Sequence, residues 1–428
     1  MKKKVTEPKT LLIESFHAAV AAADPLRIVP RHLPQPPKGR TLVVGAGKAA
    51  ASMAKAVEDH WPEKAPLSGL VITRYRHGLP TRRIRVVEAG HPVPDESGEA
   101  AAREILEEVK RLGPDDLVLA LVSGGGSSLL SLPAPGITMA DLKAVTRKLL
   151  ACGASIQEMN TVRKHLSLIQ GGRLAAASRA PVLALVISDV TGDDPTHIAS
   201  GPFAPDPTTY DDALAILKDY RIDPPPTVLD HLKRGQAGDI AETPKPGDPA
   251  FARVENRVIA TAHASLVAAG EYFRRHRIPV AILGDSVTGE AREVAQVYAA
   301  LVREVRSYAH PWQPPVALLS GGETTVTVRG SGRGGRNCEF LLALTLELGG
   351  LPGVHALACD TDGIDGTEEN AGATCGPDSL ERARALGLEA KACLADNDGY
   401  TFFERLGDLV TTGPTRTNVN DYRAILIL

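Results

Sequence analysis

The sequence predicts an α/β protein with two domains: an N-terminal Rossmann-like domain, whose parallel sheet has helices on both faces, and a smaller C-terminal α/β domain. At 428 residues the chain is longer than one ordinary domain needs. Short apolar runs alternate with helical patterns, as in parallel sheets that are buried on both faces. Two proline-rich polar stretches, DPPPT and TPKPGDP, fall between residues 205 and 249. We interpret them as a boundary, and expect the domains to be 1–240 and 250–428.

The expected elements follow one another from about residue 40 onward. Short runs of apolar residues are typical of strands, and longer runs with a helical repeat are typical of helices. We expect strands at Thr41–Val44, Leu70–Thr73, Ile84–Glu88, Leu117–Val122, Pro181–Ser188, Arg257–Thr261, Pro279–Leu283, Val316–Leu319 and His355–Ala358. We expect helices at Ala49–Trp61, Ala100–Leu112 and near Ser265–His276, and an N-terminal amphipathic helix with Leu12, Phe16 and Val20 on one face.

Composition and charge argue against several classes of protein. The chain has 43% hydrophobic and 23% charged residues, as soluble globular proteins do. Its formal charge of −3 gives no general attraction to nucleic acid or anionic membranes. The N-terminal segment lacks the apolar core of a signal peptide, and no stretch is long enough to span a bilayer. The five cysteines form no CxxC pair, which argues against disulfides and zinc. We therefore expect a cytoplasmic protein that binds neither nucleic acid nor membrane.

The first candidate site is the glycine turn VVGAGKAA, residues 43–50, between an expected strand and an expected helix. Gly45 and Gly47 allow a tight turn and a close backbone approach to a ligand, and the helix start offers N–H groups. The turn fits a relaxed dinucleotide fingerprint, but the later acidic residue is missing, since the next strand ends in Thr73-Arg74. It is not a Walker loop either. Lys48 is thus the informative residue, a cation at an anion site, with a solvated turn lysine as the alternative.

The second candidate site, SGGGSS, directly follows the expected strand Leu117–Val122. Glycines flanked by hydroxyls form a backbone that can wrap phosphate oxygens. Open α/β sheets bind ligands at this end of their strands, and three consecutive glycines are not needed merely to reverse the chain. We predict a phosphate-binding or nucleotide-binding site made of Ser123, Gly124, Gly125, Gly126, Ser127 and Ser128, together with Gly45 and Gly47.

Two further segments of the first domain carry charge. SDVTGDDPTHIASGP, residues 188–202, crowds carboxylates after an apolar strand, and Asp189 or Asp193 would suit Mg²⁺ or a general base. NTVRKHLSLIQGGRLA, residues 160–175, is basic. A solvated helix face remains the alternative for its basic residues, and it is the preferred interpretation for Lys164.

The second domain repeats the combination of glycine and charge in SGGETTV, GSGRGGRNCEF and DTDGIDGT. Arg333 and Arg336 lie among glycines, as phosphate-binding arginines do. Asp360, Asp362 and Asp365 alternate as in a calcium loop, but the loop lacks the closing glutamate of an EF-hand.

Taken in order, these segments resemble the class II glycerate kinases, whose C-terminal region is called the MOFRL domain. The N-terminal half carries VVGAGKAA, EAGHPVPDESG, SGGGSS, NTVRKHLS, SDVTGDD and IASGP. The C-terminal half carries SGGETTV, GGRN, DTDGIDG and GPTRTNVND. The resemblance spans nearly the whole chain, and several unusual motifs in one order are more specific than any single glycine loop.

The resemblance implies ATP-dependent phosphorylation of D-glycerate at the 2-hydroxyl, with Mg²⁺. The family's proposed catalytic pair falls on Lys48 and Arg336. Members are also often labelled hydroxypyruvate reductases. Three positions depart from the family pattern: Cys338 stands in place of glutamine, Gly399 in place of serine, and Arg416 in place of glycine. Arg416 adds a charge where the family pattern has none.

The expected mechanism is charge neutralisation rather than covalent catalysis. Ser123–Ser128 would hold phosphate oxygens, and Lys48 and Arg336 would neutralise the transferred group. Asp189 or Asp193 would bind Mg²⁺, or one of them would accept the hydroxyl proton. Because Arg336 lies beyond the proline-rich stretch, we expect the active site to lie between the domains and to close on binding.

Two other functions are considered. An NADPH-dependent hydroxypyruvate reductase would use the GAGKAA turn, with Arg74 on the 2′-phosphate, but it leaves SGGGSS and the acidic residues without a role. A non-catalytic sensor of sugar acids would need an output module, and the sequence contains no DNA-binding motif. The oligomeric state is left open, with a homodimer as one arrangement.

Overall fold

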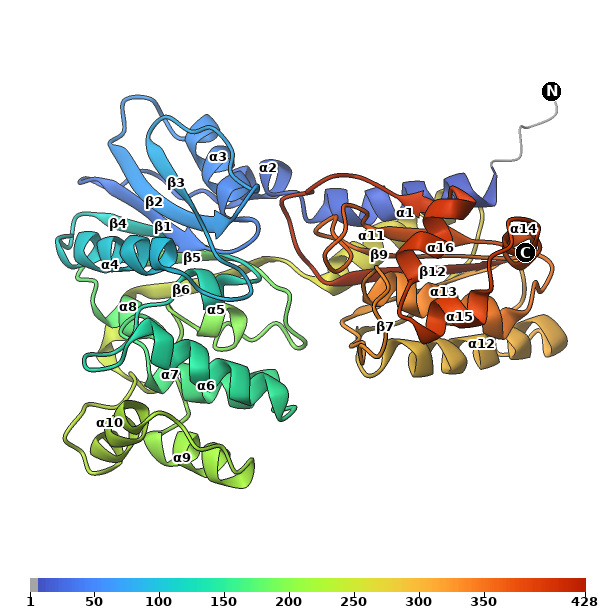
Figure 1. The fold of residues 1–428 in the computed structure, drawn as a ribbon. Helices are drawn as coiled ribbons and strands as arrows, with labels where there is room; N and C mark the ends of the chain where they lie inside the picture. The colour runs from blue at the N-terminus through green and yellow to red at the C-terminus, as the bar shows by residue number, and fades with distance from the viewer. Residues whose placement is uncertain (1–6) are drawn as a thin grey trace. The chain divides into compact units, whose positions relative to one another are not determined.

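Two compact units make up the protein. The computed structural model describes residues 7–428 (Figure 1). One unit is Pro25–Ile259, and the other joins residues 260–428 to the described residues before Pro25. Among residues 7–428, each unit has its own six-stranded sheet and its own buried core. Within the same residues, no helix is both long and apolar enough to cross a membrane.

The sheet of the first unit has the strand order β3-β2-β1-β4-β5-β6, and its neighbours from β3 to β5 are parallel. The chain moves outward from β1 to β2 and β3, and then returns to β4 on the other side of β1. The carboxyl ends of β1 and β4 therefore flank a topological switch point, where open α/β sheets bind ligands. The strands are β1 (Thr41–Ala46), β2 (Leu67–Arg74), β3 (Ile84–Ala89), β4 (Leu117–Val122), β5 (Val182–Ile187) and β6 (Val254–Ala260).

Helices cover both faces of this sheet, as the apolar composition of its strands predicts. Leu42, Val44 and Ala46 of β1 share one core cluster with the apolar face of α4 (Glu96–Lys110). Helix α3 (Ala50–His60) packs on the opposite face (Figure 1). The remaining short helices near this sheet are α2 (Pro25–Ile28), α5 (Gly126–Leu129) and α8 (Arg173–Ala176).

A helical layer with its own core completes the first unit. It contains α6 (Met139–Ala151), α7 (Ile156–His165), α9 (Tyr210–Asp219) and α10 (Pro226–Gln236), whose apolar residues form one buried cluster. Helices α9 and α10 occupy the proline-rich stretch that suggested a domain boundary. The prolines fit there because Pro225 and Pro226 stand at the start of α10, where a missing N–H costs nothing. The chain divides near Ile259 instead.

The sheet of the second unit is mixed, in the order β11-β10-β9-β12-β8-β7. Strands β7 and β8 are parallel, whereas β12 is antiparallel to both β8 and β9. The last strand of the chain thus lies in the middle of the sheet. The strands are β7 (Val280–Val287), β8 (Val316–Gly322), β9 (Val354–Asp360), β10 (Gly372–Cys375), β11 (Leu409–Val410) and β12 (Asp421–Ile427).

Two groups of helices cover this second sheet. One core cluster includes α1 (Pro8–Ala22) and α11 (Ala262–Arg275), and another includes α12 (Ala291–Tyr308), α13 (Arg336–Leu348), α14 (Ser379–Ala385), α15 (Ala390–Ala395) and α16 (Gly399–Leu406). The predicted amphipathic helix is present as α1, with Leu12 and Phe16 fully buried. Its partners are in the second unit, where the Tyr422 hydroxyl donates to Ser15 Oγ at 2.8 Å. Helix α1 therefore belongs to the second unit and not to the expected first domain, 1–240.

Candidate active site

The loops after β1 and β4 meet at the switch point of the first unit. The backbone N–H of Lys48 donates to the carbonyl of Gly124 at 2.8 Å. The backbone N–H of Ala49 donates to Ser123 Oγ at 3.0 Å. The structure therefore brings the two predicted glycine loops together and ties them by hydrogen bonds.

Gly45 and Gly47 are required by packing between β1 and β4. A Cβ atom at Gly45 would lie 1.9 Å from the carbonyl oxygen of Leu121, and one at Gly47 would lie 2.1 Å from Ser123 Oγ. Ser123 itself is fully buried. The space beside Gly47 thus holds Ser123. This contact is a sufficient reason for the glycine without any bound pyrophosphate.

Lys48 and His91 converge on the second glycine loop. Gly125 has a φ of +80°, which favours glycine, and neighbouring side chains leave no room for a Cβ atom there. A Cβ there would lie 2.8 Å from His91 Nε2 and 3.5 Å from Lys48 Cγ. The half-buried Lys48 side chain therefore runs along the turn that the sequence predicted to bind phosphate.

The serines of α5 belong to a chain of hydrogen bonds. Ser200 Oγ lies 2.9 Å from Ser127 Oγ and 3.0 Å from Asn160 Oδ1. Because an amide oxygen only accepts, the single Ser200 proton goes to Asn160, and Ser200 accepts from Ser127. Ser128 Oγ donates to the Gly125 carbonyl at 3.1 Å. The serine oxygens therefore keep lone pairs for a ligand while their protons are engaged within the protein.

The backbone at Ala199, Ser200 and Gly201 is left-handed, with φ of +53°, +59° and +58°. Such conformations are strained for residues with a side chain and persist where the surroundings impose them, often at functional sites. Here the Ala199 Cβ occupies the space beside Gly126. The strained turn thereby positions Ser200 against α5.

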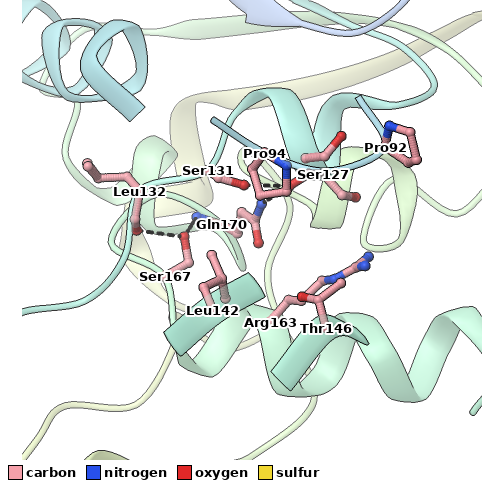
Figure 2. A pocket seen from close by; sticks show the side chains of 11 residues that line it. Pro92, Pro94, Ser127, Ser131, Leu132, Leu142, Thr146, Arg163, Ser167 and Gln170 are labelled. Carbon is pink, nitrogen blue, oxygen red and sulfur yellow. Dashed lines mark hydrogen bonds between the residues drawn. The ribbon is translucent and has the colours of Figure 1, made fainter. Parts of the chain in front are cut away.

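A small pocket lies beside α5 (Figure 2). Serine and glutamine side chains form its polar wall, and proline and leucine side chains form apolar parts. Arg163 of α7 and Thr146 of α6 lie together on the other side. The lining residues are Pro92, Pro94, Ser127, Ser128, Ser131, Leu132, Leu142, Thr146, Arg163, Ser167 and Gln170.

The basic segment of α7 is not a solvated face. Lys164, for which solvent exposure was preferred, is 1% exposed and its ammonium lies 3.3 Å from the buried Asp206 carboxylate. Burial by itself would raise the pKa of Asp206, but the Lys164 charge and the hydrogen bonds from Thr208 together lower it. The expectation for Lys164 was wrong because helix α7 is covered on both sides, by α6 and by α9.

The predicted acidic residues lie in the loop after β5, at the same edge of the sheet. Asp189 and Asp193 are half-buried, Asp194 is exposed, and Asp193 has a left-handed φ of +54°. Asp194 Oδ1 accepts the backbone N–H of Thr196 at 2.9 Å, so it shapes the loop. Among residues 7–428, no cluster of three or more His, Cys, Asp or Glu side chains could hold a metal ion by itself.

Arg336 begins helix α13 of the second unit and is held by three carboxylates. Its Nε lies 2.9 Å from Asp421, its Nη2 2.8 Å from Asp360, and its Nη1 3.1 Å from Glu323. Burial opposes the guanidinium charge, but the carboxylates of Asp421 and Asp360 raise the pKa of Arg336 well above its usual value. The group is therefore a fixed cation within a buried ion network.

Two of the three alternating aspartates of the second unit, Asp360 and Asp365, are structural partners of α13. Asp360 pairs with Arg336, and Asp365 accepts the backbone N–H groups of Asn337 and Cys338 at 3.0 and 2.8 Å. Burial raises the pKa of Asp365. Asp360 and Asp365 thus have partners within the protein.

Arg333 differs from Arg336 in its exposure. Its guanidinium lies 4.2 Å from the centre of the Tyr400 ring and pairs with Glu368. Its side chain is 52% exposed, so its charge faces solvent.

Two of the three departures from the family pattern share a local explanation. Cys338 and Gly399 are neighbours, because a Cβ at Gly399 would lie 3.0 Å from Cys338 Cβ. Cys338 is smaller than the expected glutamine, and Gly399 is smaller than the expected serine, so both members of this contact are smaller here than in the family pattern. Arg416 has a φ of +56°, a conformation that favours the glycine expected there.

Sequence reasoning did not single out four residues that complete the first site: His91, Asn160, Gln170 and Ser200. All four lie within motifs that were recognised as segments, or directly beside them. Gln170 Nε2 donates to the Ser127 carbonyl at 2.9 Å, which fixes α5. In the sequence, only their position within or beside a recognised motif could have pointed to these four residues. The packing shows which residues of each motif reach the site.

Two family models match this chain. A model described as a domain of unknown function, DUF4147, matches residues 11–233, and the MOFRL family model matches residues 316–421. A putative hydroxypyruvate reductase of Agrobacterium vitis is 51% identical, over 98% of this chain and 94% of that protein. The glycerate 2-kinase of Pyrococcus horikoshii is 40% identical, over 90% of this chain and 86% of that protein.

A solved structure is similar over the same length. The crystal structure of a glycerate kinase from Thermotoga maritima aligns with a TM-score of 0.87 and 38% identity, over 98% of this chain and 99% of that chain. Since a family model spans more than half of the chain and named relatives exceed 30% identity over nearly all of it, the chain belongs to the MOFRL-containing class II glycerate kinase family.

Proposed function

We propose that this chain transfers the γ-phosphoryl group of ATP to the 2-hydroxyl of D-glycerate. The observation that carries the proposal is Lys48, which lies along the Gly124–Gly126 turn at the switch point of a parallel sheet. A cation beside a glycine turn at that place suits phosphate binding. Relatives named glycerate 2-kinase and glycerate kinase support the same reaction.

In this reaction the glycerate hydroxyl oxygen forms a bond to the γ-phosphorus as the bond from that phosphorus to the bridging oxygen of ADP breaks. Negative charge spreads over the transferred group, so fixed cations lower the barrier. Lys48 would provide such a charge. Arg336, whose cationic form is stabilised by its carboxylates, would provide a second. A double-mutant cycle on kcat for these two residues would measure whether they act on the same step.

Mg²⁺ would neutralise the nucleotide phosphates. This ion is usually bound through one or two carboxylates together with substrate phosphates and waters, a requirement that Asp189 and Asp193 can meet. The alternative role for Asp189 is to accept the hydroxyl proton. Asp189→Asn distinguishes the two roles: loss of a ligand raises the Mg²⁺ concentration needed for half-maximal rate, whereas loss of a base lowers kcat at saturating Mg²⁺.

The rival activity is NADPH-dependent reduction of hydroxypyruvate, which the names of two relatives suggest. In the dinucleotide fingerprint the second glycine lets the backbone approach the pyrophosphate. Here the space beside Gly47 contains Ser123, with 2.1 Å between the glycine's Cβ position and Ser123 Oγ. This contact favours the kinase.

Two assays on the purified full-length chain test the proposal. The first measures ADP formation from ATP with D-glycerate and Mg²⁺, and the second measures NADPH oxidation with hydroxypyruvate. We expect turnover in the first only. The ³¹P spectrum of the product reports the hydroxyl: a phosphate on the 2-carbon couples to one proton and gives a doublet, and one on the 3-carbon gives a triplet. Reductase turnover without ADP formation would overturn the proposal.

A further inference from the structure

Arg163 differs from the basic residues that follow it on α7. Lys164 pairs with Asp206, and His165 lies 3.2 Å from Glu242. The guanidinium of Arg163 makes no hydrogen bond or ion pair with any of residues 7–428, although it lines the pocket beside α5 (Figure 2). Burial lowers its pKa. Removing a guanidinium partly from water without giving it a partner is unfavourable. Its place in a cavity therefore points to an anionic ligand.

The opposite wall of the pocket has complementary chemistry. The protons of Ser128 and Ser131 are donated to the carbonyls of Gly125 and Ser127, at 3.1 and 3.0 Å. Because the single Ser200 proton goes to Asn160, the Ser127 hydroxyl, 2.9 Å from Ser200 Oγ, directs its proton to Ser200. These hydroxyls therefore present oxygen lone pairs to the cavity, which suit a ligand that donates O–H groups. The pocket thus offers one fixed cation on one side and hydrogen-bond acceptors on the other.

We propose that Arg163 binds the carboxylate of the hydroxy-acid substrate, and that the hydroxyl groups of the substrate point toward the serines of α5. A carboxylate can accept two parallel N–H bonds from one guanidinium. The wall opposite Arg163 offers few donors to a phosphate dianion, because the Ser128 and Ser131 protons are donated within the protein and Pro94, Leu132 and Leu142 are apolar. Arg163 is thus a specificity-determining residue, and this role rests on the proposed kinase function.

The first test is steady-state kinetics of Arg163→Met in the full-length protein. Loss of one charge-assisted bidentate contact should raise KM for D-glycerate roughly 10- to 100-fold, while KM for ATP stays unchanged. Arg147→Met is the matched control, since Arg147 is an exposed arginine on the adjacent helix α6. The control should keep both KM values.

The second test isolates the carboxylate. Glycerol is an acceptor without a carboxylate, so the ratio of kcat/KM for D-glycerate over glycerol should fall in Arg163→Met by the same factor as KM rises. Arg163→Lys should be intermediate, because it keeps the charge and loses the fork. Added guanidinium ion should partly restore glycerate turnover to Arg163→Ala.

The outcomes separate the two proposals. If the wild type does not phosphorylate D-glycerate, the proposed function fails, whatever Arg163 does. If the wild type is active but Arg163→Met keeps its KM for D-glycerate and raises KM for ATP, the pocket binds nucleotide phosphate and the Arg163 inference is overturned. Unchanged thermal unfolding of Arg163→Met and Arg163→Lys shows that a kinetic loss does not come from unfolding.

Discussion

Two arginines, one in each unit, have opposite environments. Arg336 is surrounded by Asp360, Asp421 and Glu323, and two of these carboxylates are almost completely buried. Arg163 lines a pocket and has no partner among residues 7–428. The same residue type therefore serves different ends. The charge of Arg336 is fixed in place by carboxylates of its own unit, whereas the charge of Arg163 is left unbalanced at a cavity and is available to a ligand.

The largest expected effect is on turnover, and it comes from Lys48, which lies in the first unit together with Arg163. Lys48→Ala should lower kcat roughly 10²- to 10³-fold, since a fixed charge near the transferred group is lost. Circular dichroism and thermal unfolding should match the wild type. A variant with near-wild-type kcat would place the catalytic cation elsewhere.

The next effect is on stability, through Arg336. Arg336→Met leaves buried carboxylates unpaired and should lower the free energy of unfolding of the second unit by about 3–5 kcal/mol. The chain has two tryptophans, Trp61 in the first unit and Trp312 in the second. Urea unfolding followed by Trp312 fluorescence in a Trp61→Phe background therefore reports this unit alone.

A second variant checks the physical reason for that loss. Adding Asp360→Asn to Arg336→Met removes one of the unpaired charges and should recover part of the stability. If Arg336→Met unfolds like its background, the ion network contributes nothing measurable, and the contrast with Arg163 is lost.

A smaller effect tests the packing beneath the first site. Gly47→Ala should destabilise the first unit by about 1–3 kcal/mol, because the added methyl overlaps Ser123. The control is Gly153→Ala, which also has a positive φ but has nothing within 4 Å of its Cβ position. Trp61 fluorescence in a Trp312→Phe background measures both. Equal losses would mean that backbone conformation, and not contact with Ser123, requires Gly47.

The smallest effect is expected for the stability of Arg163→Met. With no partner to lose, the first unit should keep its free energy of unfolding within about 0.5 kcal/mol. Trp61 fluorescence in a Trp312→Phe background measures this free energy as well. A loss comparable to that of Arg336→Met would show that Arg163 has a structural partner and would weaken its assignment to a ligand.

Much of the first sheet could be predicted from the sequence. Leu117–Val122 was predicted with both ends correct, and the other strands of that sheet were placed within a few residues. Buried parallel strands are uniformly apolar, so each is visible by itself. Strand β12 was missed, although Ala424–Leu428 is wholly apolar, because nothing local shows that the last strand enters the middle of a sheet.

The sequence by itself determined the fold class, the glycine loops at the carboxyl ends of strands, and the family, because apolar periodicity and motif order are written along the chain. Only the tertiary structure decided which charges are balanced. Lys164 and Arg163 are adjacent and equally basic in the sequence, yet one pairs with Asp206, which is 42 positions away, and the other faces a pocket. Pairing of a buried charge depends on distant residues that meet only when the helices pack, and no local pattern records it.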